Sequence, residues 1–262
     1  MIYPLKLLQI ETTNLCNSNC IFCIHSSLKN LGTMSDELFL KILKDAKKIP
    51  TLETIIPMML GEPFVDKKMI SRLKLINKIL PGKKIEIFTN ISLITPKIIE
   101  QLKEIDNTTM IFSLNGYNKE TRKKLMGLDD YDHCVEMIDL YVKTGKPYFV
   151  SMIMHPSVSD REIEDFKKNS KWNITISEYK NWSGDKFDAP RQTHCRRAIS
   201  EMTIMWNGKV NLCCMEYGKV IFGDINKESV LSVWESKHRQ MYARMHSQGE
   251  WMKGVCSNCT KA

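Results

Sequence analysis

Three cysteines lie close together near the start of the chain. Cys16, Cys20 and Cys23 are separated by three and two residues. They follow the apolar run Leu7 to Ile10, which predicts a strand. Thiolates at this spacing favour an iron–sulfur cluster or zinc, and either takes four ligands. Because the loop supplies only three, one metal position stays open for another ligand, which is typical of a catalytic centre.

This segment, with an aromatic residue just before the last cysteine, resembles the signature loop of the radical S-adenosylmethionine (SAM) superfamily. The resemblance implies a [4Fe–4S] cluster whose fourth iron is chelated by SAM. It also implies that SAM is cleaved to a 5′-deoxyadenosyl radical, which abstracts a hydrogen atom from the substrate. The backbone of Phe22 would lie beside the adenine. A zinc site completed by a distant residue such as His25 is the alternative.

Further motifs of the same family follow later predicted strands. The turn Leu60-Gly61-Glu62-Pro63 resembles the Gly-Gly-Glu motif that binds the SAM amino group, with leucine in place of the first glycine. Gly61 lets the backbone come close, and Glu62 offers an anion to the ammonium. Turn chemistry is the alternative for the Asn-Gly pair at 115–116. The resemblance implies further SAM contacts at the ends of later strands, by Asn90, Ser113, Asn115, Ser151 and Ile153.

Six apolar or alternating segments predict the strands that position these residues: 7–10, 52–60, 84–89, 108–114, 147–154 and 172–177. Helical spacing and capping residues predict helices between them, over 35–48, 69–80, 95–105, 118–126, 131–144 and from a capping box at 159–162. Such alternation indicates parallel βαβ units, which right-handed crossovers curl into a barrel or part of one. We therefore expect an α/β fold, a partial (β/α)6 radical SAM barrel. In βα barrels the chemistry sits at the C-terminal strand ends, where the motifs lie.

Four more cysteines with metal-ligand spacing follow in the C-terminal part: Cys195, Cys213, Cys256 and Cys259. Asn207-Gly208 predicts a hairpin of residues 201–206 and 209–212, and residues 228–245 have helical spacing. This part resembles the SPASM/twitch extension of radical SAM enzymes, in the short twitch form. The resemblance implies one auxiliary [4Fe–4S] cluster held by these four cysteines. A zinc ribbon is the alternative.

The domain organisation expected from these patterns has three parts. Residues 1–180 form the core barrel, and residues 181–194, which break the periodicity, form a connector. Residues 195–262 form the SPASM/twitch domain, a β-hairpin plus helix.

Two cysteines remain outside the two ligand sets. Cys134 shares an apolar helical face and is expected to be inert core. The side chain of Cys214 would point opposite to that of Cys213 if the strand continues. Some radical SAM epimerases use a cysteine beside the auxiliary site to return a hydrogen atom to the substrate radical. Cys214 is therefore a candidate hydrogen-atom donor, and a second small buried thiol is the alternative.

Composition limits the setting and the partners. Hydrophobic content of 43% and charged content of 26% are ordinary for a soluble domain, and no apolar run approaches the roughly 20 residues that a bilayer requires. With no signal peptide visible, we expect a cytoplasmic protein whose thiols stay reduced. The net charge of +8 is dispersed, which indicates no nucleic-acid or membrane partner. Arg191, Arg196 and Arg197 lie near Cys195, where they could meet an anionic substrate or be solvated.

The resemblance implies an enzyme with SAM and two [4Fe–4S] clusters, fed by an electron donor such as flavodoxin or ferredoxin. Size and twitch layout are similar to those of radical SAM dehydrogenases of the 2-deoxy-scyllo-inosamine type and to radical SAM epimerases. The leading hypothesis is dehydrogenation or epimerisation of a small polar molecule such as a sugar, cyclitol or aminoglycoside. The alternatives are a peptide-modifying radical SAM enzyme (an epimerase or thioether-forming maturase) and a non-catalytic zinc-binding protein.

Overall fold

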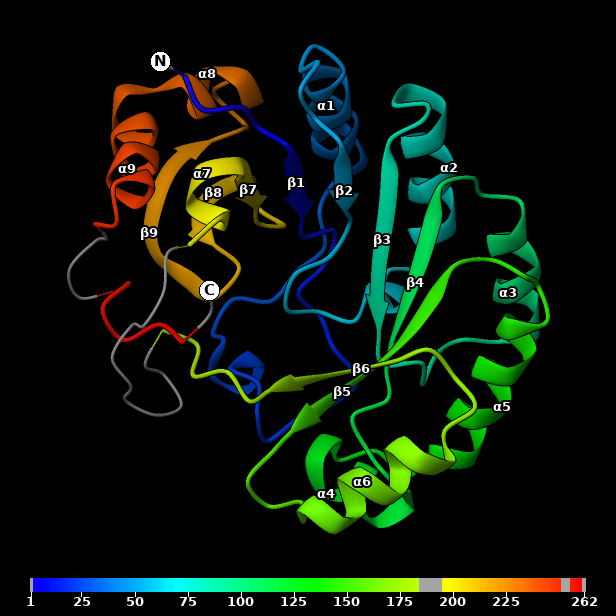
Figure 1. The fold of residues 1–262 in the computed structure, drawn as a ribbon. Helices are drawn as coiled ribbons and strands as arrows, with labels where there is room; N and C mark the ends of the chain where they lie inside the picture. Colours follow the sequence, from blue (N-terminus) through cyan, green and yellow to red (C-terminus); the bar gives the residue numbers. More distant parts are fainter. Residues whose placement is uncertain (1, 184–194, 251–254, 261–262) are drawn as a thin grey trace.

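A computed structural model describes residues 2–183, 195–250 and 255–260 of the chain. Its sheet has nine strands within these ranges: β1 (Leu7–Ile10), β2 (Thr54–Ile56), β3 (Lys84–Thr89), β4 (Thr108–Ser113), β5 (Tyr148–Met154), β6 (Ile174–Glu178), β7 (Glu201–Ile204), β8 (Lys209–Cys213) and β9 (Glu216–Asp224). They lie in the order β6-β5-β4-β3-β2-β1-β7-β8-β9 (Figure 1). Residues 184–194 of the expected connector lie outside the described residues.

The pairing of the strands divides the sheet into two parts. Strands β1 to β6 pair in parallel with their neighbours, as the βαβ pattern predicted. Strand β7 adds to the free side of β1, also in parallel, and then pairs antiparallel with β8 across Asn207-Gly208. The fold is therefore an α/β partial barrel followed by the predicted hairpin, and both lie in one continuous sheet. The division into three domains stays a prediction.

Helices follow the strands and cover the outer face of the parallel part. The described helices are α1 (Asp36–Ala46), α2 (Met69–Ile79), α3 (Pro96–Lys103), α4 (Lys119–Met126), α5 (Tyr131–Val142), α6 (Asp160–Asn169), α7 (Arg197–Ser200), α8 (Val230–Glu235) and α9 (Lys237–Ser247). Helices α1, α2, α3 and α5 contact one another in turn outside β1 to β4 (Figure 1). The predicted caps are present, since Ser35 and Thr95 accept hydrogen bonds from Leu38 N and Ile98 N. No helix in the described ranges is long and apolar enough to cross a membrane.

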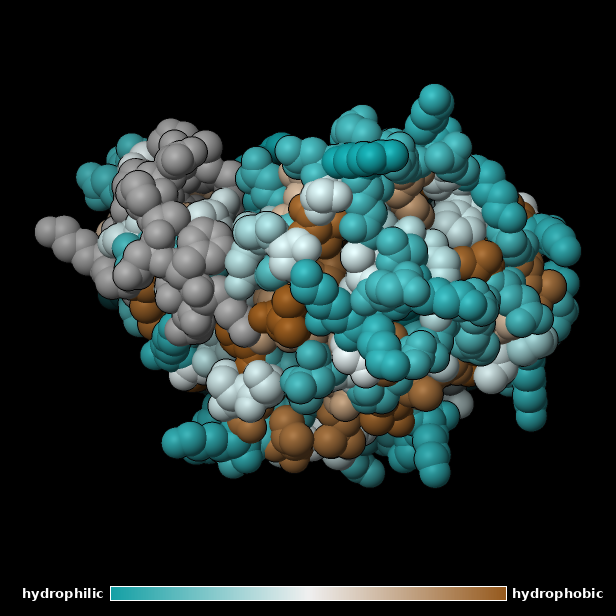
Figure 2. Space-filling view, turned by 90° about the horizontal axis from the view of Figure 1, so that it is seen from below, coloured by the Kyte–Doolittle hydropathy of each residue, from teal (hydrophilic) through white to brown (hydrophobic). Residues whose placement is uncertain are grey.

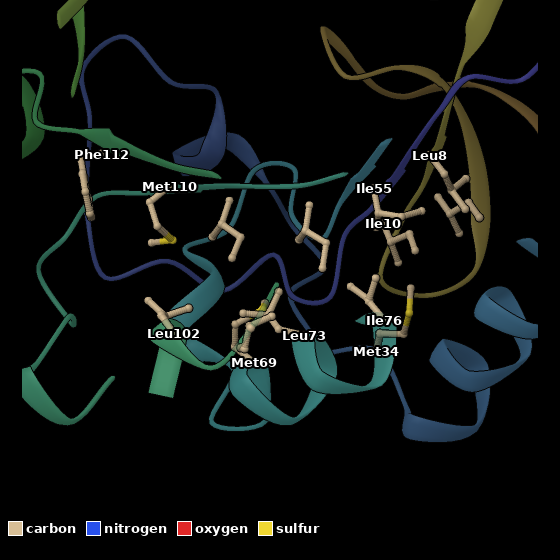
Figure 3. Close-up of a cluster of buried hydrophobic side chains, with 14 of the residues drawn as sticks. Leu8, Ile10, Met34, Ile55, Met69, Leu73, Ile76, Leu102, Met110 and Phe112 are labelled. Carbon is tan, nitrogen blue, oxygen red and sulfur yellow. The ribbon is translucent and has the colours of Figure 1, made fainter. Parts of the chain in front are cut away.

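The main core lies between the sheet and these helices. Fully buried side chains from β1, β2 and β4 point toward the helix layer, from which side chains of α2 and Leu102 of α3 face them (Figure 3). Burying each large aliphatic side chain stabilises the fold by about 1.5–3 kcal/mol, so this layer fixes the register of the strands. The strand side chains are Leu8, Ile10, Ile55, Met110 and Phe112, and those of α2 are Met69, Leu73 and Ile76.

Three sequence-based expectations are wrong in detail. The second strand, expected over residues 52–60, covers only Thr54–Ile56, because Pro57 has no N–H for the ladder. The helix expected over residues 228–245 is two helices, since Ser236 has extended backbone (ψ 143°) and caps α9. The capping box expected at residues 159–162 is only half formed, because the Glu162 carboxylate accepts from Asn118 Nδ2 instead.

A fully buried arginine holds the ends of β3 and β4 together. Arg122 of α4 donates to the carboxylate of Asp130 at 2.6 Å. It also donates to the carbonyl oxygens of Leu114 at 2.6 Å and Asn90 at 2.8 Å. These two carbonyls belong to the segments that follow β4 and β3. Arg122 therefore fixes the loops where the predicted SAM contacts lie. The sequence predicted only that Arg122 lies on a helix, and it did not predict this role.

We expect Arg122→Met to lower the free energy of unfolding by about 3–5 kcal/mol, because the Asp130 carboxylate would lose its buried partner and two carbonyl groups would lose a donor. Thermal unfolding of the purified protein measures this change. Lys123→Met is the matched control, since the ion pair of Lys123 with Asp129 is exposed. Equal effects of the two substitutions would contradict the role of Arg122.

Candidate active site

A cavity of about 340 Å³ lies at the C-terminal ends of the parallel strands and extends to the β8–β9 turn. Figure 2 shows the molecule from below, the side toward which β1 to β3 point in Figure 1, and apolar (brown) groups are exposed there among hydrophilic (teal) ones. The cavity brings together eleven of the residues predicted from sequence: Cys16, Cys20, Phe22, Cys23, Gly61, Glu62, Asn90, Ser113, Asn115, Ile153 and Cys214.

One predicted contact is placed differently. Ser151 of β5 is not among the described residues that line this cavity. It pairs in register with Ser113, and its carbonyl oxygen accepts a weak hydrogen bond from Asn115 N at 3.4 Å. Ser151 thus supports the backbone of a lining residue, and its direct contact with SAM stays a prediction.

The cysteine loop is attached to the C-terminal end of α4. Ser18 Oγ donates to the carbonyl oxygen of Met126 at 2.7 Å and lies 3.0 Å from Cys20 Sγ. The backbone of Ile21 donates to Leu125 O at 2.9 Å. Burial raises the pKa of Cys16 to about 11 and that of Cys20 to about 12. A bound metal is needed to hold these thiols as thiolates at neutral pH.

In the Gly61-Glu62 turn, Gly61 lets the backbone lie against that of the Thr13 segment, and Glu62 offers a carboxylate that can receive a cation. A Cβ atom on residue 61 would lie 2.3 Å from the carbonyl oxygen of Thr13, so only glycine fits. Glu62 is 3% exposed and accepts from Thr89 Oγ1 at 2.8 Å, Phe64 N at 3.1 Å and Asn90 N at 2.7 Å. A carboxylate has about four acceptor positions, so one stays available for an ammonium group. Burial raises the pKa of Glu62 to about 7.

The ends of β3 and β4 contain two left-handed residues. Ile91 has φ +75°, a conformation that costs a branched side chain about 1–3 kcal/mol. Asn115 has φ +43°, and its Oδ1 atom is buried without a hydrogen-bond partner among the described residues. An unpartnered buried acceptor beside the cavity is costly unless a ligand donates to it. In contrast, the Asn90 side chain is already bonded to Asn17 and Ser92 N.

The four cysteines predicted for the auxiliary site occupy one neighbourhood. Cys195 and Cys256 belong to a small buried cluster with Tyr242, whose hydroxyl lies 3.4 Å from Cys256 Sγ. Burial raises the pKa of Cys213, and the nearby thiols of Cys214, Cys195 and Cys259 raise it further. No group of three or more His, Cys, Asp or Glu side chains in the described ranges is arranged to hold a single metal ion. The thiolates of a cluster bind different iron atoms, so they do not converge on one point.

The two remaining cysteines differ as expected from the sequence. Cys134 is fully buried in the main core, which confirms the prediction. Cys214 lines the cavity, and Arg197 Nη1 donates to its Sγ atom at 3.1 Å. The thiol therefore lies at the same cavity as the cysteine loop.

A buried glutamate joins the barrel to the hairpin, and sequence reasoning missed it. Glu11 is 0% exposed and accepts from Leu60 N at 3.4 Å, Trp206 N at 3.3 Å and the Tyr217 hydroxyl at 2.9 Å. Burial raises its pKa to about 7, although the three donors favour the charged form. The sequence signal was an acid directly between an apolar strand and the first cysteine, Cys16.

Residues 181 and 182 connect the two cysteine-bearing loops. Trp182 Nε1 donates to the carbonyl oxygen of Phe22 at 2.7 Å. The buried Asn181 side chain accepts from Thr260 N at 3.1 Å and donates to Asn258 O. The first contact reaches the Cys16 to Cys23 loop, and the second reaches the segment around Cys259.

The partial barrel and the cavity at its strand ends define the class of the protein. A loop with three cysteines lies beside a buried carboxylate with one free acceptor position and an unpartnered amide oxygen. This donor set fits an iron–sulfur cluster bound by SAM through its amino acid part. The class is therefore that of SAM-dependent iron–sulfur enzymes.

Comparison with protein-family models gives the family. Residues 10–169 match the Radical SAM superfamily, and residues 195–260 match SPASM, an iron–sulfur cluster-binding domain. The chain belongs to the radical SAM superfamily, whose cofactors are SAM and [4Fe–4S] clusters. This membership favours iron–sulfur clusters over the zinc sites that the cysteine spacing had left open.

Among curated relatives, the chain is 33% identical over 112 residues to the tungsten-containing aldehyde ferredoxin oxidoreductase cofactor-modifying protein of Pyrococcus furiosus, covering 42% of this chain and 31% of that protein. It is 25% identical over 174 residues to GTP 3′,8-cyclase of Petrotoga mobilis, covering 64% of this chain and 51% of the cyclase. The chain therefore matches only about half or less of the length of these relatives.

Solved structures share the whole fold at low identity. BtrN in complex with AdoMet and 2-DOIA has a TM-score of 0.74 at 16% identity and covers 100% of this chain and 95% of BtrN. SuiB of Streptococcus suis, bound to precursor peptide SuiA, has a TM-score of 0.74 at 17% identity and covers 93% of this chain and 67% of SuiB. At this identity the likeness shows the fold alone.

We expect Gly61→Ala to weaken SAM binding at least tenfold, because the added methyl group must displace the backbone of the Thr13 segment. Equilibrium binding of SAM to the reconstituted protein, with iron content measured in parallel, tests this. Gly82→Ala is the control for backbone strain away from the site: its φ of +77° disfavours alanine, but a Cβ there meets no atom within 4 Å and residue 82 precedes β3 at the opposite edge of the sheet. An unchanged SAM affinity in Gly61→Ala would contradict the assigned close approach.

We expect the stability of the wild type relative to Glu11→Gln to fall as the pH rises from about 5 to about 8. A carboxyl group whose pKa is higher in the folded state binds a proton on folding, so its contribution to stability falls between the unfolded and folded pKa values. For Glu11 these are 4.5 and about 7, which corresponds to roughly 2–3 kcal/mol. Thermal unfolding of both proteins at pH 5 and 8 measures the difference, and a constant difference would refute the shift.

Proposed function

We propose that the chain is a radical SAM oxidoreductase that acts on a small polar molecule such as a sugar, cyclitol or aminoglycoside, and that it epimerises this substrate. One observation carries the proposal: Cys214 lines the same cavity as Cys16, Gly61 and Glu62. The volume of about 340 Å³ lies within the range of small-molecule sites. A reducing, cytoplasmic setting is part of the proposal, because the cysteines act as thiols and thiolates.

The residues at the strand ends hold and orient the cofactors. Cys16, Cys20 and Cys23 are the ligands of the first cluster, and the Glu62 carboxylate receives the SAM ammonium at its free acceptor position. Asn115 Oδ1 accepts a hydrogen bond from the bound SAM. When bound, SAM and the first cluster supply the radical that abstracts a hydrogen atom from the substrate, and the auxiliary cluster supplies an electron acceptor.

Cys214 completes the epimerisation. Its S–H bond breaks as a new C–H bond forms on the face of the substrate carbon opposite to the one that lost hydrogen. The sulfur is left as a thiyl radical, which regains one electron from an external donor such as flavodoxin or ferredoxin and one proton from solvent. The Arg197 guanidinium, 3.1 Å from Cys214 Sγ, orients the sulfur.

Dehydrogenation is the second candidate, supported by the auxiliary ligand set next to the cavity. Cys213 is adjacent to the cavity-lining Cys214 and lies near Cys195. In this reaction the substrate radical would lose one proton to a base and one electron to an acceptor, and no hydrogen atom would return. The role of Cys214 therefore separates the two reactions.

We expect Cys214→Ala to abolish the return of hydrogen while the substrate is still activated. Incubation with candidate sugars and aminoglycosides in deuterated buffer should give wild-type product with one solvent deuterium at the inverted carbon. The variant should still form 5′-deoxyadenosine but at least tenfold less deuterated product. Cys134→Ala is the control, because that thiol is fully buried in the main core. Unchanged product formation by Cys214→Ala would remove the thiol as donor and favour dehydrogenation.

A further inference from the structure

One cationic side chain at the cavity has unused hydrogen-bonding capacity. Arg197 lines the cavity, and its side chain is 25% exposed. Its Nη1 group donates to Glu201 Oε2 at 2.8 Å and to Cys214 Sγ at 3.1 Å. The Nε and Nη2 groups make no hydrogen bond with the described residues. The neighbouring Arg196 is exposed and is not among the residues that line the cavity. Of the three arginines that the sequence left equivalent, these two are now distinguished, and Arg191 lies outside the described residues.

The free edge of this guanidinium has a defined chemistry. Nε and Nη2 are two parallel N–H donors, and this fork matches the two oxygens of a carboxylate or phosphate. A hydroxyl or an amine of a neutral sugar offers no such pair of acceptors. The contacts of Nη1 to Glu201 and Cys214 fix the guanidinium plane, so little side-chain entropy is lost when an anion binds.

A second cation faces the same cavity from another element. Lys180 follows β6 and also lines the cavity. Its Nζ atom lies 3.7 Å from the carboxylate of Glu178, whose side chain is 78% exposed. The Lys180 side chain itself is 26% exposed, and at 3.7 Å its ion pair with an exposed carboxylate is weak, so Lys180 can turn toward an anion in the cavity. The buried acid of the cavity, Glu62, is already bonded to the segment after β3 and does not neutralise these cations.

We infer that the substrate carries a carboxylate or phosphate group, which binds to the Nε and Nη2 edge of Arg197 with Lys180 as a second contact. This inference rests on the proposed function and names the substrate class of the same site. Since Nη1 of the same guanidinium is bonded to Cys214 Sγ, the anion fixes the substrate beside the thiol. Neutral cyclitols and aminoglycosides are thereby disfavoured against acidic or phosphorylated sugars.

Anaerobic calorimetric titration of the reconstituted, SAM-saturated protein tests this inference. The probes are glucuronate, glucose 6-phosphate and neutral glucose, so that the two anions distinguish carboxylate from phosphate. We expect at least one anion to bind at least tenfold more tightly than glucose. Arg197→Gln should remove at least tenfold of that affinity, Arg197→Lys should have an intermediate effect because it lacks the fork, and Arg196→Gln should have none. Equal binding of glucose and both anions would overturn the inference.

Two controls exclude other roles of Arg197. The first is SAM affinity: if Arg197→Gln weakens SAM rather than the anion, the guanidinium holds the SAM carboxylate and the inference fails. The second is iron content: if the variant loses iron but keeps anion affinity, Arg197 serves only as a counter-charge to Cys213 and Cys195, and the inference again fails. The titration measures binding and needs no turnover. If the protein binds the anion but forms no product, the proposed function is contradicted and the inference about the anion still holds.

Discussion

The structure depends on one buried carboxylate at the end of β1. Glu11 accepts hydrogen bonds from the turn before Gly61, from Trp206 in the hairpin and from Tyr217 of β9. Burying a carboxylate costs several kcal/mol unless donors surround it, so these three segments must stay where they are. Because Cys16 follows in the same loop, a single acidic group fixes the turn before Gly61 and the hairpin relative to the cysteine loop.

Some polar groups of the cavity are already bonded within the protein, which limits what a ligand can contact. Asn90 is held by Asn17 and Ser92, and Glu62 keeps only one acceptor position. The groups that stay available on the described lining residues include that position, the buried oxygen of Asn115 and the open edge of Arg197. The three groups differ in charge and in hydrogen-bonding role. The carboxylate position suits an ammonium group, the amide oxygen suits a hydrogen-bond donor, and the guanidinium edge suits an anion. Ligand choice thus follows from what the fold leaves unpaired.

Local patterns in the sequence predicted most elements, because caps and periodicity act over a few residues. Strand β3 has the predicted bounds, and the cysteine motif lies at a strand end as expected. The short β2 strand was missed because the ladder stops at Pro57, although the missing N–H was visible. The role of Glu11 could not be predicted, since its partners lie far away in the chain, and that of Arg122 was missed because its bonds to backbone carbonyls follow no local sequence pattern. Tyr217, for example, is 206 positions from Glu11.

The link through Asn181 and Trp182 limits how this chain can vary in length. Two successive residues bond to Phe22 in one cysteine loop and to Asn258 and Thr260 in the other. An insertion between positions 181 and 182 would shift one contact by a residue and break the correspondence between the loops. We expect changes in length to be tolerated better at exposed turns, such as those at Gly82 and Gly145, where an added Cβ atom would meet no atom within 4 Å. The link therefore fixes the spacing between the N-terminal cysteine loop and the C-terminal cysteine segment.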